Sequence, residues 1–142
     1  MSTAGANAIG LLVEKFQEFL EWIFEPKRKS DFEKLRDIDE YLKKDFDINI
    51  NEIIESDFTH ITFKIENIEI RILDQLILLI YQSNLNNTKP DFLKNINEQQ
   101  LYLRLMELIE FAEKKSKKLS LDRNNLKNSL QQYLLVLSFD LP

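Results

Sequence analysis

The sequence predicts an all-α protein of five to six helices, and three observations support this fold class. The only glycines are Gly5 and Gly10, so the chain from Leu11 to Pro142 lacks the residue that β-hairpins and phosphate-binding loops need where φ is positive. Apolar residues recur at spacings of three and four along most of the chain, which is the period of a helix with one buried face. Helix-capping residues and prolines separate these periodic segments.

Length and composition indicate a single folded domain over residues 1–142. Of the 142 residues, 44% are hydrophobic and 30% are charged, which is ordinary for a globular protein with its own core. The small and polar residues 1–7 are expected to be disordered. The chain has no cysteine, which excludes disulfides, thiolate metal sites and cysteine nucleophiles.

The charge and hydropathy of the chain argue against two classes of partner. Its 24 acidic and 19 basic residues give a net charge of −5, whereas nucleic-acid-binding proteins usually carry a basic excess. No apolar run reaches the roughly 18–20 uncharged residues of a membrane span, and no secretory signal pattern is present. We therefore expect a cytoplasmic protein without nucleic-acid or membrane partners.

The first predicted helix spans residues 8–24 and ends before Pro26, because the residue before a proline disfavours the helical conformation. Its apolar stripe is widened beyond one face by several large side chains. We expect this extra apolar surface to contact a partner or the core. The candidate interface residues are Leu11, Lys15, Trp22 and Phe24.

Two further helices are predicted at residues 31–44 and 51–55. The segment Ser30-Asp-Phe-Glu33 has the pattern of a capping box before the first of them, and Asn51 is the expected cap of the second. The other carboxylates of residues 31–44 lie on the polar side of the helix and are expected to face solvent: Asp37, Asp39 and Glu40.

Residues 60–72 allow two interpretations. The segments from His60 to Ile65 and from Ile68 to Ile72 alternate apolar and polar residues, which is typical of a β-hairpin. However, Glu66-Asn67 is not a favoured hairpin turn, and the second segment continues at helical spacing. We predict a short helix at 58–65 and a long one at 68–84, with the hairpin as the alternative.

The remaining residues predict two long helices. The first spans 92–118 and ends in the basic turn 114–118, where lysines favourably meet the negative end of the helix dipole. Ser120 is the expected cap of the second, which spans 121–137 and is followed by a short tail. The residues expected to face inward are Leu101, Leu105, Leu108, Ile109 and Ala112 in the first helix, and Leu126, Leu130, Tyr133, Leu134 and Leu137 in the second.

Few residues are candidates for catalysis or for binding a ligand or metal. His60 is the only histidine, and Asp57 three residues earlier can share a helical face with it, which would suit a small-ligand or hydrolytic site. One histidine cannot supply the paired motifs of a metal centre in a helical bundle. Glu107, Glu110 and Glu113 recur on one polar face that is expected to be solvated. We predict no catalytic, cofactor-binding or metal-binding residues.

Four segments of the chain resemble a family of uncharacterised bacterial all-helical proteins whose C-terminal half is tetratricopeptide-like. They are LLVEKFQEFLEWIF, DFEKLRDIDEYLKKDFDIN, IRILDQLILLIYQSN and YLRLMELIEFAEKKSKKLSLDRNNLKNSLQQYL. The resemblance implies N-terminal antiparallel helices packed on a C-terminal repeat-like helical pair with a capping helix. It implies no activity and assigns no site.

The sequence therefore favours a non-enzymatic protein–protein interaction module or a self-associating scaffold, with another protein or a second copy as partner. The alternative is a small-ligand-binding or hydrolytic helical protein that uses His60 with Asp57.

Overall fold

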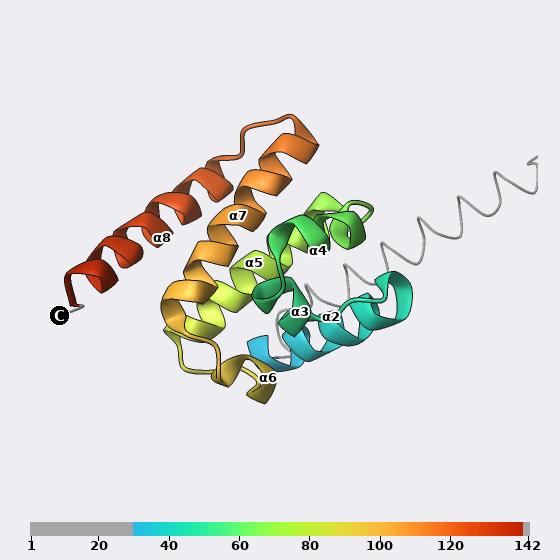
Figure 1. Cartoon of the computed structure of the whole chain (residues 1–142), viewed down its shortest axis with the longest axis horizontal. Coiled ribbons are helices and arrows are strands. Elements are labelled where there is room, and N and C mark those ends of the chain that lie inside the picture. The colour runs from blue at the N-terminus through green and yellow to red at the C-terminus, as the bar shows by residue number, and fades with distance from the viewer. Residues whose placement is uncertain (1–29, 141–142) are drawn as a thin grey trace, which may run out of the picture. The chain divides into compact units, whose positions relative to one another are not determined.

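The computed structural model describes residues 30–140, which form seven helices and no strand (Figure 1). The all-α prediction is confirmed, and the predicted count of five to six helices is too low. The predicted helix at 8–24 lies outside the described residues. The helices are α2 (Asp31–Phe46), α3 (Ile50–Glu55), α4 (Phe58–Ile65), α5 (Ile70–Leu85), α6 (Asp91–Lys94), α7 (Glu98–Ser116) and α8 (Leu121–Asp140).

The antiparallel helices α5 and α7 form the centre of the described unit, which begins at Asp31. α2 packs on α5, α8 packs on α7, and α3 packs on both α7 and α4. The inward positions that the periodicity predicts on α7 are all fully buried, from Leu101 to Ala112. On α5, Leu73, Leu76 and Ile80 are fully buried as well. The two central helices therefore supply most of the core.

Residues 60–65 and 70–72 are helical and residues 66–69 form the turn between α4 and α5, so the hairpin alternative is wrong. Ile61, Ile65, Ile68 and Ile72 are all fully buried, at spacings of four, three and four residues. The same isoleucines produce the apparent alternation in the sequence, because a helical stripe and a strand share many short spacings. The turn between α4 and α5 carries Ile68 into the core, and this contact fixes where the first helix ends.

The cap of α3 is Asn49, so the assignment to Asn51 is wrong. The Asn49 side chain accepts a hydrogen bond from the backbone N–H of Glu52 at 2.7 Å. The Asn51 side chain instead donates to the carbonyl oxygen of Phe92 at 2.7 Å and so ties α3 to α6. The cap lies two residues earlier than predicted because Ile50, the first residue of the helix, is fully buried.

Asp39 is buried, which contradicts the solvated position predicted for it. Only 6% of the residue is exposed, and its Oδ1 accepts a hydrogen bond from the backbone N–H of Ile50 at 2.7 Å. Its other carboxylate oxygen pairs with Lys43 at 3.0 Å. Asp39 on α2 therefore satisfies an N–H in the first turn of α3 that has no partner within its own helix.

We expect Asp39→Ala to lower the free energy of unfolding by about 1.5 kcal/mol, because it leaves the buried N–H of Ile50 without an acceptor. Asp39→Asn keeps an oxygen at that position and should lose less. Urea unfolding followed by circular dichroism measures both variants. Equal losses in the two would show that charge, and not the hydrogen bond to Ile50, is what matters.

The helix predicted at 92–118 is interrupted, and its two parts are α6 and α7. Asn97 caps α7, since its side chain accepts from the N–H groups of Gln99 at 2.9 Å and Gln100 at 3.2 Å. Ile96, which is 5% exposed, anchors the connecting turn in the core. An asparagine side chain that bonds to the backbone competes with helix continuation, which explains the break.

α8 begins where the sequence predicts but ends three residues later. Its start is as predicted, because the N–H of Arg123 donates to Ser120 Oγ at 3.3 Å. Its end lies at Asp140, beyond the predicted residue 137. Of its five positions predicted to face inward, only Leu130 is fully buried, while Tyr133 is 38% exposed and the others are intermediate.

No turn within residues 30–140 contains glycine. Left-handed backbone conformations occur at Asp47, Asn87 and Lys117, with φ between 53° and 57°. Aspartate and asparagine tolerate this region better than other residues with a Cβ, but lysine pays a steric cost of roughly 1 kcal/mol. Lys117 forms the C-terminal cap of α7, where its N–H donates to the carbonyl of Glu113 at 3.0 Å.

Candidate functional site

The interface predicted on residues 8–24 lies outside the described part of the chain. This applies to Leu11, Lys15, Trp22 and Phe24. Their role stays a prediction.

The described candidates for chemistry are exposed. Asp57 and His60 lie at the start of α4, and both side chains face solvent. Glu107 and Glu110 are also exposed, as expected for a solvated face. Within residues 30–140 there is no group of three or more histidine, aspartate or glutamate side chains that could hold a metal ion.

The basic turn 114–118 is partly structural. The Lys115 ammonium donates to the carbonyl oxygens of Glu66 and Ile68, the latter at 2.6 Å, and so holds the turn between α4 and α5. Partial burial of this ammonium lowers the pKa of Lys115. Lys114, Lys117 and Lys118 are exposed. The run therefore offers fewer free cations than the sequence indicates.

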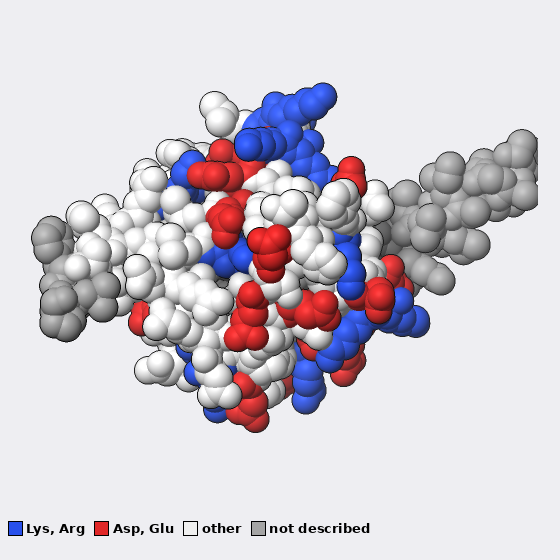
Figure 2. All heavy atoms as spheres, viewed as in Figure 1, with Lys and Arg blue, Asp and Glu red and all other residues white. Residues whose placement is uncertain are grey.

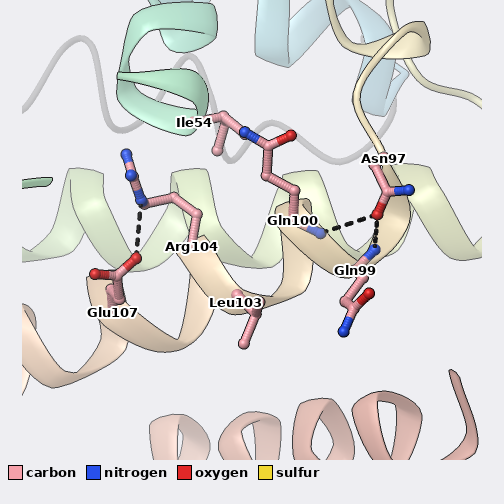
Figure 3. Close-up of a pocket in the computed structure, with 7 residues that line it drawn as sticks. All are labelled: Ile54, Asn97, Gln99, Gln100, Leu103, Arg104 and Glu107. Atoms are coloured by element: carbon pink, nitrogen blue, oxygen red, sulfur yellow. Dashed lines mark hydrogen bonds and ion pairs between the residues drawn. The ribbon is translucent and has the colours of Figure 1, made fainter. Parts of the chain in front are cut away.

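A hollow of about 590 Å³ lies beside Arg104, between the first turns of α7 and the end of α3 (Figure 3). The guanidinium is nearly buried, and its two terminal nitrogens donate to the carbonyl oxygens of Ile53 and Ser56, the latter at 2.6 Å. Its Nε pairs with Glu107 at 3.2 Å. It also lies 5.3 Å from the ring centroid of Phe58. Because these contacts occupy the guanidinium, Arg104 is a structural residue and does not serve as a free cation for a ligand in the hollow.

A different surface has the features of a binding site, namely the groove between α5 and α8. The two helices are joined by side chains at both ends, with Arg123 pairing with Asp74 at 2.9 Å and Tyr133 packing on Tyr81 at a centroid distance of 6.3 Å. Because the contacts follow the same order along both helices, α5 and α8 run parallel. α7 lies against both of them and contributes Ile109 to the floor. Two hollows of about 180 and 280 Å³ lie along this α5–α8 groove.

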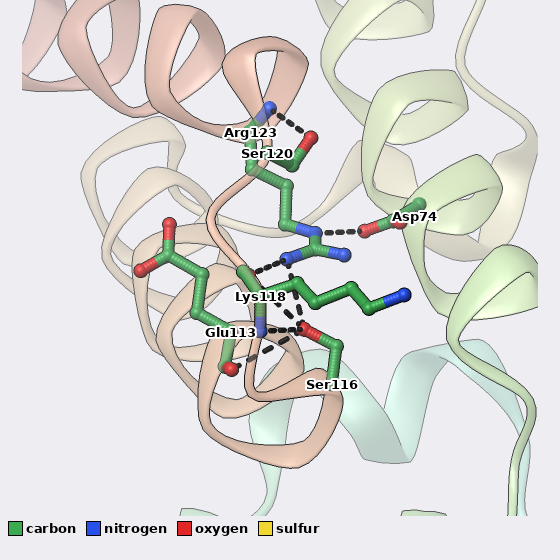
Figure 4. Close-up of polar contacts among 6 residues, drawn as sticks. All are labelled: Asp74, Glu113, Ser116, Lys118, Ser120 and Arg123. Atoms are coloured by element: carbon green, nitrogen blue, oxygen red, sulfur yellow. Dashed lines mark hydrogen bonds and ion pairs between the residues drawn. The ribbon is translucent and has the colours of Figure 1, made fainter.

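Arg123 lies at one end of the groove, and Figure 4 shows its polar contacts with α5 and with the turn before α8. It comes from the first turn of α8 and is 9% exposed. Besides the ion pair with Asp74, its Nη1 donates to Ser116 Oγ at 3.3 Å and to the carbonyl oxygen of Lys118 at 3.2 Å. One side chain thus holds α5, the end of α7 and the turn before α8 together. Its burial is not evident from the sequence, where a lone arginine in a polar segment resembles a surface residue.

Three tyrosines occupy the other end of the groove. The Tyr102 ring lies 6.0 Å from Tyr81 and 5.5 Å from Tyr133, centroid to centroid. Tyr102 is fully buried, and its hydroxyl oxygen accepts a hydrogen bond from the Asn84 side chain at 2.6 Å. Burial raises the pKa of the Tyr102 hydroxyl well above its ordinary value, and it raises the pKa of Tyr81 as well. These hydroxyls are therefore protonated hydrogen-bonding groups at neutral pH.

Asp74, Asp122 and Arg123 lie at one end of the groove, and beyond them the exposed and half-exposed side chains that line both walls carry no charge. We call this surface the neutral face. In Figure 2 the surface over the C-terminal half of α8 is almost entirely white, which means that few charged side chains lie there. The neutral face consists of the lining residues Gln75, Leu78, Ser129, Gln132 and Val136, together with the residues that continue their stripes at helical spacing, Gln82 and Leu85 on α5 and Asn125 on α8.

One feature of the sequence does indicate the neutral face, although no single residue in it does. Residues 75–88 and 128–139 contain no aspartate, glutamate, lysine or arginine, although 30% of the chain is charged. The contacts described above place these two segments side by side. Interfaces are depleted of charge at their centre, so two uncharged segments on neighbouring helices are the pattern to look for.

Most of the side chains that line the groove are uncharged. The only ionisable groups lining its two hollows besides the tyrosines are Asp74, Asp122 and Arg123, and two of these pair with each other. Among residues 30–140, no helix is both long and apolar enough to cross a membrane. No protein-family model, no curated protein and no solved structure matches the chain.

Proposed function

We propose that this chain is a non-enzymatic protein-interaction module and that its α5–α8 groove holds a helical segment of a partner protein. The observation that carries the proposal is the neutral face, in which two parallel helices present uncharged walls above an apolar floor. An amphipathic helix binds in such grooves through apolar side chains spaced three and four residues apart.

The spacing of the wall residues suits a helical ligand. On α5 the neutral face follows steps of three, four and three residues, and on α8 steps of four, three and four. Each wall is therefore a straight stripe along its helix, and a third helix can lie between the two stripes. The glutamine and asparagine side chains supply hydrogen bonds at the rim without the desolvation cost of a charge.

The order of helices supports the resemblance to tetratricopeptide-like proteins as part of this proposal. In helical repeat proteins, each unit is an antiparallel pair, and the first helices of successive units lie side by side along a binding surface. Here α5 and α7 are an antiparallel pair, and α8 lies beside α5 in the parallel sense. The groove between α5 and α8 thus corresponds to the surface that repeat proteins use for binding.

The proposal predicts that Leu78→Lys abolishes partner capture. Leu78 lies at the centre of the α5 wall and is 37% exposed, so a lysine there leaves the core intact but puts a charge in the path of an apolar ligand. We expect a protein that the wild-type chain captures from native-host lysate to fall at least tenfold with this variant, read by quantitative mass spectrometry.

The matched control is Phe63→Lys on α4, where an apolar side chain that is 76% exposed lies away from the groove. This variant should capture the partner as the wild type does, and circular dichroism should show both variants folded. Capture that is lost with Phe63→Lys but retained with Leu78→Lys would place the binding surface elsewhere. Trp22→Ala in the same experiment tests the second predicted surface, which includes Leu11, Lys15 and Phe24.

A further inference from the structure

The turn between α7 and α8 exposes two leucines almost completely. Within residues 30–140, three large apolar side chains have more than 70% of their surface exposed, and two of them lie here, Leu119 at 94% and Leu121 at 74%. Leu119 belongs to the turn itself, and Leu121 is the first residue of α8. Because their own chain covers so little of these side chains, both leave apolar surface in water that an occupant can bury.

The same turn is strongly basic in an acidic chain. Residues 114–121 contain four of the 19 basic residues and no acidic one, which leaves 15 basic against 24 acidic residues elsewhere, a net charge of −9. Lys114, Lys117 and Lys118 are exposed, and none of them forms an ion pair within the described residues. Figure 2 shows basic side chains gathered over this turn. The turn is therefore complementary to an anionic surface.

The leucines and the small size of the turn distinguish among anionic partners. Nucleic acids offer phosphates to lysines, but their bases stack on aromatic side chains and gain little from leucine. A stable protein interface needs about 20–30 residues a side, and this turn has eight. A wider contact would set the flanking Glu113 and Asp122 against an acidic partner. A bilayer with anionic lipids needs no wider contact, because its headgroups attract the lysines and its interface takes up projecting apolar side chains.

We propose that the α7–α8 turn docks this chain reversibly on the surface of a lipid bilayer that contains anionic headgroups. Leu119 and Leu121 enter the boundary between headgroups and acyl chains, while Lys114, Lys117 and Lys118 lie against the anionic headgroups. Nothing in this contact crosses the bilayer. It uses none of the residues of the neutral face, so it goes beyond the proposed function and does not depend on it.

The acidic remainder of the chain does not cancel this attraction. At physiological salt, charges more than about 8 Å apart are largely screened from one another. α7 has 19 residues and is about 28 Å long at 1.5 Å per residue, so the charges at its far end act weakly on a surface that touches the turn. The expectation of no membrane partner rests on net charge and on the lack of a spanning segment, and neither describes the charge of a single turn.

Co-sedimentation of the full chain with phospholipid vesicles tests this docking. Each lysine near an anionic leaflet raises the binding constant about fivefold, so we expect at least tenfold stronger binding to phosphatidylcholine vesicles with about 30% phosphatidylserine than to phosphatidylcholine alone. Raising NaCl from about 0.1 to 0.5 M should remove most of this binding, because salt screens the attraction. Lys118→Glu should weaken binding at least fivefold. Lys44→Glu makes the same change in net charge at an exposed position on α2 and should leave binding unchanged.

The absence of native cysteine allows a direct test of which side chain enters the bilayer. Leu119→Cys labelled with an environment-sensitive fluorophore should shift its emission to the blue when the anionic vesicles are added. The same label at Leu135→Cys, a 58% exposed position near the other end of α8, should not shift.

Three results would overturn the proposal: no binding to the anionic vesicles at low salt, binding that Lys118→Glu leaves unchanged, or a label at position 119 that stays in water. A chain that binds poly-glutamate through Lys118 but does not bind vesicles would assign the turn to an acidic protein, which also overturns it. Capture of a lysate protein through Leu78 is measured without vesicles, so failure of this docking and failure of the groove are distinguishable.

Discussion

Arg104→Ala should lower the free energy of unfolding by about 3 kcal/mol. The side chain is nearly buried, and it satisfies the carbonyl oxygens of Ile53 and Ser56 at the end of α3. Without it, both carbonyls lose a charged donor, at about 1–3 kcal/mol each when no water replaces it. The contact with Phe58 is lost as well. Urea unfolding followed by circular dichroism measures the change.

Two further variants separate the causes of this loss. Arg104→Lys retains the positive charge but not the planar pair of donors that reaches two carbonyls at once, so it should recover only part of the loss. Glu107→Gln removes only an exposed ion-pair partner and should cost less than about 0.5 kcal/mol. A loss below 1 kcal/mol for Arg104→Ala would mean that α3 holds its position without this anchor.

Alkaline pH should destabilise the fold through Tyr102. Because burial raises the pKa of its hydroxyl in the folded chain, the unfolded chain releases this proton first as the pH rises past about 10. Above that pH the folded state holds more protons than the unfolded state, so stability falls with increasing pH. The decline is at most about 1.4 kcal/mol per pH unit for one group, or about 2 kcal/mol between pH 10 and 11.5.

Tyr102→Phe is the variant that isolates this contribution. At pH 8 it should be about 1 kcal/mol less stable than the wild type, because the Asn84 amide loses the shorter of its two hydrogen bonds and keeps only the 3.4 Å one to Glu98. Above pH 10 its stability should fall less steeply, and the two curves should converge. Titration of lysines and the other tyrosines is common to both proteins, so the difference between the curves reports Tyr102. Parallel curves up to pH 11.5 would contradict the prediction.

Much of the fold follows from spacing in the sequence. The buried isoleucines Ile61, Ile65, Ile68 and Ile72 follow a helical stripe, and the stripe on α7 from Leu101 to Ala112 identifies its inner face. The ends of the helices are harder to predict from the sequence than their buried faces. Asn49 and Asn51 are equally good caps by residue type, and only the burial of Ile50 decides between them. The same holds for Asn97, whose cap interrupts a segment of otherwise helical pattern.

The site could be predicted much less well, because it depends on which helices become neighbours. A single sequence shows that residues 75–88 and 128–139 are uncharged, but it does not show that they meet. Arg123 and Asp39 illustrate the same limit. Each is a charged residue on an apparently polar face, and each is buried because a group from a distant segment needs a partner, namely Asp74 for Arg123 and the N–H of Ile50 for Asp39.

The attachment of α8 to the rest of the described unit has a consequence for how binding would be detected. Its first turn is fastened by Arg123, while none of residues 131–138 is fully buried. The helix is thus secured at one end and free to open from the other, so opening its last turns costs less than unfolding the whole. A molecule bound in the groove would hold those turns closed. Slowed amide hydrogen exchange confined to the end of α8 would therefore register an occupant before any change in overall shape.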